Sequence, residues 1–105
     1  MNHIKDKCEI QTISIGFTDG WCIIPMVTGV SKTICFEQKG RKFITAIEVI
    51  KKDDEKYEVE LSTFYHGNYR SYTELFEKYT AVGKVALHIE NNLVEYVNKL
   101  IDKMI

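Results

Sequence analysis

Proline, arginine and net charge are scarce in this 105-residue chain, which has one proline, two arginines and a formal charge of −1. Basic and acidic residues balance, 14 against 15, whereas nucleic-acid-binding domains usually concentrate positive charge on one face. No apolar run approaches the ~18 residues that a membrane-spanning helix needs. The polar start, residues 1–7, lacks the apolar core of a signal peptide. We therefore expect one soluble α+β domain, residues 1–105, with no nucleic-acid or membrane partner.

Cysteine and metal-binding motifs are also sparse. The three cysteines, Cys8, Cys22 and Cys35, are odd in number and not closely spaced, which suits a reducing cytoplasm. Neither Cys-x-x-Cys nor His-x-x-x-His occurs, so we expect no metal site. The Gly-x-Ser-x-Gly and dinucleotide-binding fingerprints are missing as well. The sequence predicts no cofactor and no catalytic residue.

The longest periodic stretch runs from Thr80 to Ile105 and predicts one long amphipathic helix. At ~100° per residue, its apolar side chains share one stripe that must pack against an apolar surface. The stripe consists of Val82, Val85, Ala86, Ile89, Leu93, Tyr96, Val97, Leu100 and Met104.

The chain before this helix alternates like β-strands. Asp19-Gly20 favours a two-residue type I′ turn, which predicts a hairpin between a strand over Glu9–Phe17 and the next one. The expected cross-strand pairs are Phe17 with Cys22, Ile15 with Ile24, and Ile13 with Met26. Pro25 lacks an N–H, so this second strand carries a bulge or is unpaired on one side there.

Three further turns extend this pattern to five strands. A loop over Gly29–Ser31 would pair Met26 with Ile34 and Ile24 with Phe36, and would leave Cys22 on the core face. Lys39-Gly40 would set Phe36 opposite Phe43. A loop over Asp53–Glu55 gives Val49 with Val59 and Ile47 with Leu61, because a shorter Asp53-Asp54 loop would mix the two faces. All turns then present one common apolar face, which predicts a five-stranded antiparallel meander.

A short helix is expected between the last strand and the long helix. Ser71 and Glu74 have the spacing of a capping box, so we predict a helix from Tyr72 to about Tyr79. The predicted fold is a five-stranded antiparallel meander, flat or curled into a partial barrel, followed by this short helix and the long helix on one sheet face.

The connection after the fifth strand combines tyrosines, an arginine and a histidine around a glycine. Tyr and Arg are enriched at binding hot spots, and Trp21 is the single tryptophan. The alternative is that these tyrosines only cap the ends of the core. The predicted partner-binding residues are Tyr65, His66, Asn68, Tyr69, Arg70, Tyr72 and Trp21.

Two apolar surfaces remain without a predicted partner. Leu87, Val94 and Ile101 recur every seven residues beside the main stripe. They either widen the core contact or form a seam for another helix, which a second copy could supply. The sheet face away from the helix is too apolar for a freely solvated surface, so curling, the short helix or a second chain is expected to cover it. It would carry Ile10, Trp21, Ile23, Val27, Cys35, Ile44, Ile50 and Phe64.

Together these features predict a cytoplasmic, non-catalytic protein-binding module, that is, an inhibitor, adaptor or regulator of bacterial or phage type, with homodimerisation as an open question. One alternative is single-stranded nucleic-acid binding, with Trp21, Phe64 and the loop tyrosines stacking on bases. Another is a small enzyme with a pocket between helix and sheet near His66.

Overall fold

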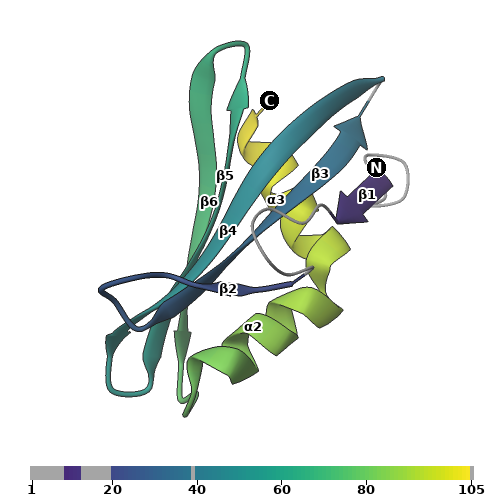
Figure 1. Cartoon of the computed structure of the whole chain (residues 1–105). Helices are drawn as coiled ribbons and strands as arrows, with labels where there is room; N and C mark the ends of the chain where they lie inside the picture. The colour runs from purple at the N-terminus through teal and green to yellow at the C-terminus, as the bar shows by residue number, and fades with distance from the viewer. Residues whose placement is uncertain (1–8, 13–19, 39, 105) are drawn as a thin grey trace.

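The computed structural model describes residues 9–12, 20–38 and 40–104. An antiparallel sheet is followed by two helices (Figure 1). Neighbouring strands follow the order β1-β3-β4-β5-β6, and β2 also pairs with β3. The sheet stays open and does not close into a barrel, which confirms the predicted α+β class. The bounds are β1 Glu9–Thr12, β2 Cys22–Ile23, β3 Gly29–Gln38, β4 Arg41–Asp53, β5 Lys56–Tyr65, β6 Asn68–Glu77, α2 Val82–Asn91 and α3 Leu93–Met104.

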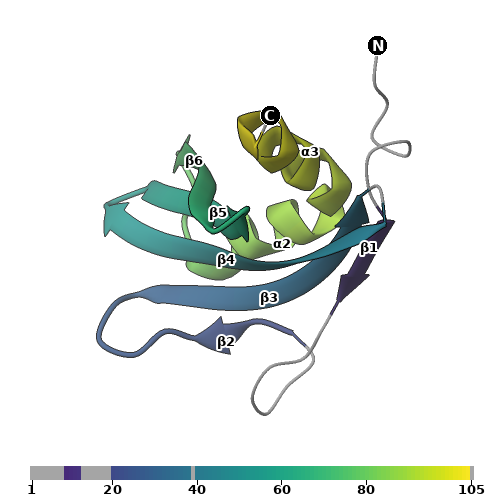
Figure 2. The same ribbon diagram turned by 90° about the horizontal axis from the view of Figure 1, so that it is seen from above.

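Both helices cover the same face of the sheet (Figure 2). The predicted stripe forms their buried side, and Ile101, which the stripe did not include, is also fully buried. The strands contribute every second residue to this core, as their period of two requires. The fully buried members are Ile34, Phe36, Thr45, Ile47, Val49, Val59, Leu61, Val85, Ile89, Val97, Leu100 and Ile101.

The central registers agree with the sequence prediction. Phe36 lies opposite Phe43 across β3 and β4, and Val49 lies opposite Val59 across β4 and β5. The loop between β4 and β5 differs in detail, because Asp53 pairs with Lys56 and a register irregularity lies between Lys51 and Asp53. A tight turn and one extra residue in β4 therefore achieve the shift that we assigned to a longer loop.

The N-terminal strands differ from the prediction. β1 pairs with β3 and not with β2, and the expected partners Ile13, Ile15 and Phe17 lie outside the described residues. β2 is short and sets Cys22 opposite Ser31, so the predicted pairs of Met26 and Ile24 with β3 are wrong. Cys22 lies with Ser31 on the face that points away from the helices, and not on the predicted core face. Pro25 and Met26 are the central residues of a turn. Met26 is fully exposed and has φ 71°, and Pro at the first central position favours such a turn.

The predicted short helix after Tyr72 is wrong, because residues 68–77 form strand β6. His66 and Gly67 both have positive φ, 53° and 78°, which is the geometry of a two-residue type I′ turn. The turn folds β6 back along the whole of β5. Ladder hydrogen bonds along ten residues outweigh a capping-box pattern that satisfies only two backbone groups.

The predicted long helix is divided in two at Asn92. This residue leaves the helical region with φ −127° and ψ 31°. Its side-chain Nδ2 donates to the carbonyl oxygen of His88 at 2.9 Å, and its N–H donates to the carbonyl oxygen of Ile89 at 3.1 Å. Thr80 and Ala81 precede α2, and Ile105 lies outside the described residues. The predicted stripe therefore packs on the sheet as two segments, α2 and α3.

Candidate functional site

The sheet face opposite the helices carries a row of large apolar side chains. Ile44, Phe64 and Tyr69 are 66%, 65% and 52% exposed. Phe64 and Tyr69 lie directly opposite each other on β5 and β6, and their rings meet edge to face at 5.7 Å. Cys35 of β3 lies opposite Ile44 and is buried. We call Cys35, Ile44, Phe64 and Tyr69 the open-face row.

Small and acidic residues lie beside the open-face row on the same face. The next positions along β3, β4, β5 and β6 are Thr33, Ala46, Ser62 and Ser71. Beyond them Glu48 and Glu60 lie directly opposite each other. The Tyr69 hydroxyl donates to Glu60 Oε2 at 2.7 Å, and this hydrogen bond raises the pKa of Tyr69. Like charges directly opposite each other are unfavourable within a sheet, so a positively charged group bound here would reduce the repulsion between Glu48 and Glu60.

Cationic groups flank the other side of the open-face row, at the β5–β6 turn. Arg41 Nη1 lies 3.3 Å from His66 Nδ1, and the Arg41 guanidinium lies 5.9 Å from the centre of the Tyr65 ring. A hollow of about 320 Å³ opens between these side chains and the open-face row. It is lined by Arg41, Lys42, Phe43, Ile44, Thr63, Phe64 and His66.

The predicted partner-binding residues divide over both faces of the sheet. Tyr69 points to the open face, and His66 and Asn68 are exposed at or beside the turn. Tyr65, Arg70 and Tyr72 share the helix-facing side; Tyr65 packs on Phe43, with ring centres 5.9 Å apart. Ile44 and Phe64 were expected on the far face but were not assigned to the binding site. Both residues alternate with buried neighbours along their strands, and this period of two was the signal that could have assigned them to the binding site.

Trp21 was expected on the far face but lies on the helix side. Its Nε1 donates to Glu90 Oε1 of α2 at 3.2 Å, and Lys32 Nζ lies 2.6 Å from the same oxygen. Lys32 is only 7% exposed, so the carboxylate compensates a buried charge. A nearby apolar hollow of about 280 Å³ is lined by Trp21, Val30, Gly83, Ala86, Leu87 and Glu90.

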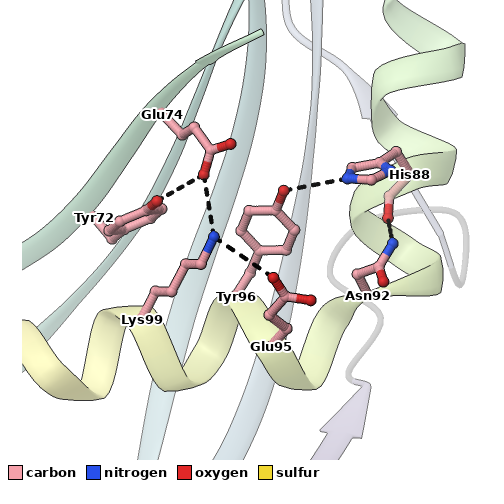
Figure 3. A network of polar contacts seen from close by, with 7 residues as sticks. All are labelled: Tyr72, Glu74, His88, Asn92, Glu95, Tyr96 and Lys99. Carbon is pink, nitrogen blue, oxygen red and sulfur yellow. Dashed lines mark hydrogen bonds and ion pairs between the residues drawn. The ribbon is translucent and has the colours of Figure 1, made fainter.

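A polar and aromatic network joins β6 to both helices (Figure 3). The Tyr72 hydroxyl donates to Glu74 Oε1 at 2.6 Å, and Lys99 Nζ lies 3.4 Å from the same oxygen. The Tyr96 hydroxyl lies 3.3 Å from His88 Nε2, next to the break at Asn92. Lys99 Nζ also lies 4.8 Å from the centre of the Tyr96 ring. These contacts explain how β6 and the two helices are fixed relative to one another.

The same network shifts three pKa values upward. Burial, followed by the charge of Glu74, raises the pKa of Tyr96 to about 12. Burial and the hydrogen bond to Glu74 raise the pKa of Tyr72. Burial lowers the pKa of Lys99, but Glu74, Tyr72 and Tyr96 raise it by more, so the net shift is upward. All three groups are therefore held in their protonated forms.

The three residues of the predicted self-association seam do not lie on one surface. Leu87 and Val94 are 59% and 39% exposed, whereas Ile101 is fully buried against the sheet. A seam through all three would need Ile101 to leave the core. Leu87 and Val94 stay available to a partner.

Among the residues that the structure describes, no group of three or more His, Cys, Asp or Glu side chains could hold a metal ion. None of the helices in this described part has the length and apolar character that crossing a bilayer requires. No protein-family model matches the chain. Searches of curated proteins and of solved structures also return no match.

Proposed function

We propose that this chain is a cytoplasmic, non-catalytic protein-binding module, an inhibitor, adaptor or regulator, that binds its partner with the open-face row. The supporting observation is the exposure of Ile44, Phe64 and Tyr69 across three neighbouring strands, on the face that the helices leave uncovered. Covering apolar surface releases about 25 cal/mol per Å², so burial of these side chains would contribute several kcal/mol to a complex. Large exposed apolar patches commonly mark interaction sites.

The charges beside the row define what the partner should carry. Glu48 and Glu60 lie on one side of it, and Lys42 with Arg41 lies on the other. A complementary partner is apolar at its centre, basic against the glutamate pair and acidic against the turn. Charge patterns of this kind fix the orientation of a complex and raise its association rate.

Site-specific photo-crosslinking in cells that express the chain tests this proposal. A benzophenone side chain at Phe64 is expected to capture one protein of defined mass. The same side chain at Leu87, which is 59% exposed and lies on α2, is the matched control and should not capture it. The changes Glu48→Lys and Glu60→Lys should weaken capture at position 64. Equal capture at both positions, or none at position 64, would contradict the proposal.

Single-stranded nucleic-acid binding is the second candidate, because Phe64 and Tyr69 are exposed sheet aromatics close to Arg41 and Lys42. Such aromatics stack on bases in known single-strand binders. Against it, the glutamate pair lies where a phosphate track would run, and Trp21 lies on the other face. Fluorescence anisotropy with a labelled 20-nucleotide DNA or RNA decides between the two. Salt-sensitive binding that is lost with Phe64→Lys would favour this candidate.

The enzyme alternative placed a pocket between helix and sheet around His66. His66 instead lies exposed in the β5–β6 turn, with its ring 4.2 Å from that of Tyr65. The absence of catalysis stays a prediction.

A further inference from the structure

Strand β6 is a long edge of the sheet within the described residues. It has ten residues, contains no proline and pairs with β5 on one side (Figure 1). The strand at the opposite end of the sheet order, β1, has four residues. Long edge strands without proline or a bulge present a row of unpaired N–H and C=O groups that can pair with another chain.

The β5–β6 turn determines which backbone groups of β6 point outward. Tyr65 and Asn68 close the two-residue turn, and in such a hairpin the closing pair is hydrogen-bonded. Every second residue after Asn68 therefore bonds to β5. The N–H and C=O groups that point away from β5 belong to the residues between them, Tyr69, Ser71, Thr73 and Leu75.

We infer that β6 pairs antiparallel with β6 of a second copy of this chain, about a two-fold axis that passes between the two Tyr72 residues. In this register Tyr69 lies opposite Leu75 of the second copy, and Ser71 lies opposite Thr73. All four residues present outward hydrogen-bonding groups, so each of these pairs exchanges two backbone bonds. The Tyr69 carbonyl oxygen, which accepts from Arg70 in one copy, then accepts from the N–H of Leu75 of the second copy. The result is one continuous sheet through both copies.

Side-chain chemistry selects this register over its neighbours. It sets Arg70 opposite Glu74 of the second copy, and the symmetry repeats that ion pair. A shift of one step in either direction would set Arg70 opposite Tyr72 or Phe76 and leave Arg70 without a counter-charge, while Glu74 would keep only its contact with Lys99. The chosen register also joins Tyr69 to Leu75, which are both 52% exposed in one copy. Opposite-charge and apolar cross-strand pairs stabilise sheets, whereas like charges destabilise them.

The two charged side chains share the helix-facing side of β6 and differ in the contacts that they make within one copy. Glu74 is held by Tyr72 and Lys99 (Figure 3). Arg70 donates to the backbone oxygen of Tyr69 and makes no ion pair with any residue that the structure describes. Because both lie at non-hydrogen-bonded positions of the new pair, their Cα atoms would be about 4.5 Å apart, the closer of the two antiparallel spacings.

Sedimentation of the full chain from 5 µM to 1 mM tests the inference. A pair of edge strands buries less than a standard interface of ~1,600 Å², so the dimer should form with a dissociation constant between about 10 µM and 1 mM. Thr73→Pro removes an outward N–H and spares the bonds to β5, so it should leave a folded monomer. Thr73→Val keeps the N–H and should dimerise like the unaltered chain.

A charge series tests the register. Arg70→Glu puts like charges opposite each other twice and should raise the dissociation constant at least about tenfold, whereas Arg70→Lys should change it little. Phe64→Lys, which disables the open-face row, should leave the dimer intact, so this result is independent of the proposed function. A dimer that survives both Thr73→Pro and Arg70→Glu, or a monomer at 1 mM, would overturn the inference.

Amide hydrogen exchange on the unaltered chain gives a check that needs no variant. As concentration rises, exchange should slow at Tyr69, Ser71, Thr73 and Leu75, whose N–H groups point outward. The neighbouring amides of Tyr72 and Glu74 bond to β5 in the monomer and should change far less. Uniform protection along β6, or none at the outward amides, would also overturn the inference.

Discussion

Lys32 is the clearest case of a single side chain whose environment the sequence does not reveal. Lysine is almost never fully buried unless it is paired, and in β3 it lies at a core-facing position opposite Ile47. Its counter-charge, Glu90, comes from α2, 58 residues further along the chain. Local patterning cannot predict a pair that only the packing of α2 on the sheet creates.

Neutralising Glu90 and neutralising Lys32 should change the free energy of unfolding by different amounts. Glu90→Gln leaves the buried ammonium without a counter-charge and should lower the free energy of unfolding by about 2 kcal/mol. Lys32→Met removes the buried charge while the carboxylate, which is 37% exposed, keeps access to water, so this change should stay within about 1 kcal/mol. Urea unfolding measures both. Equal losses would show that Lys32 does not depend on this carboxylate.

At the scale of elements, the sequence predicted the strands whose faces differ most clearly. β3, β4 and β5 alternate between buried and exposed residues, and a slip of one position would turn every apolar residue outward. β2 and β6 were predicted incorrectly, and the helix break at Asn92 was not predicted. Each depends on one residue, Met26, His66 or Asn92, whose backbone leaves the regular strand or helix region. The local signals for two of them, Pro25 and Gly67, compete with the strand pattern and with the capping-box spacing.

Two glycines provide a matched test of the element boundaries. A Cβ on Gly29 at the start of β3 would lie 2.6 Å from the carbonyl oxygen of Val49, whereas one on Gly83 in α2 would meet nothing within 4 Å. Gly29→Ala should therefore lower stability by about 1–3 kcal/mol, because backbone must move. Gly83→Ala should raise it by about 0.5–1 kcal/mol through helix propensity. Thermal and urea unfolding should give opposite signs, and the same sign in both would contradict the placement of β3.

At the scale of the whole molecule, the binding surface was only partly predictable. The sequence placed Ile44 and Phe64 on the far face but left them out of the binding site. It grouped Tyr69 instead with Tyr72 and Trp21, which face the helices. The error came from treating residues 65–72 as one loop. A strand sends successive side chains to opposite faces, so a contiguous aromatic segment cannot form one surface there.

The network between β6, α2 and α3 should make stability fall in alkali. The pKa of Tyr96 is about 12 in the native chain and about 10 when unfolded. Between pH 10 and 12 the unfolded chain therefore loses a proton that the native chain keeps, and stability that is fully present below pH 10 falls by about 1.4 kcal/mol per pH unit. The upward shifts of Tyr72 and Lys99 act in the same direction.

The measurement is the free energy of unfolding in urea from pH 8 to 12. Tyr96→Phe removes the largest shifted group and should flatten the fall. At pH 8 this variant should cost only about 1 kcal/mol, the contribution of the hydroxyl's contact with His88. An unchanged slope in the variant would mean that Tyr96 is not the group responsible.

The order of elements has a consequence for synthesis on the ribosome. β3 to β6 are joined by three successive hairpins, so each strand can find its neighbour soon after it emerges. Both helices follow all the strands in chain order. The apolar face of the nascent sheet therefore stays exposed to solvent until α2 and α3 have been translated. During that interval the chain would be a substrate for chaperones.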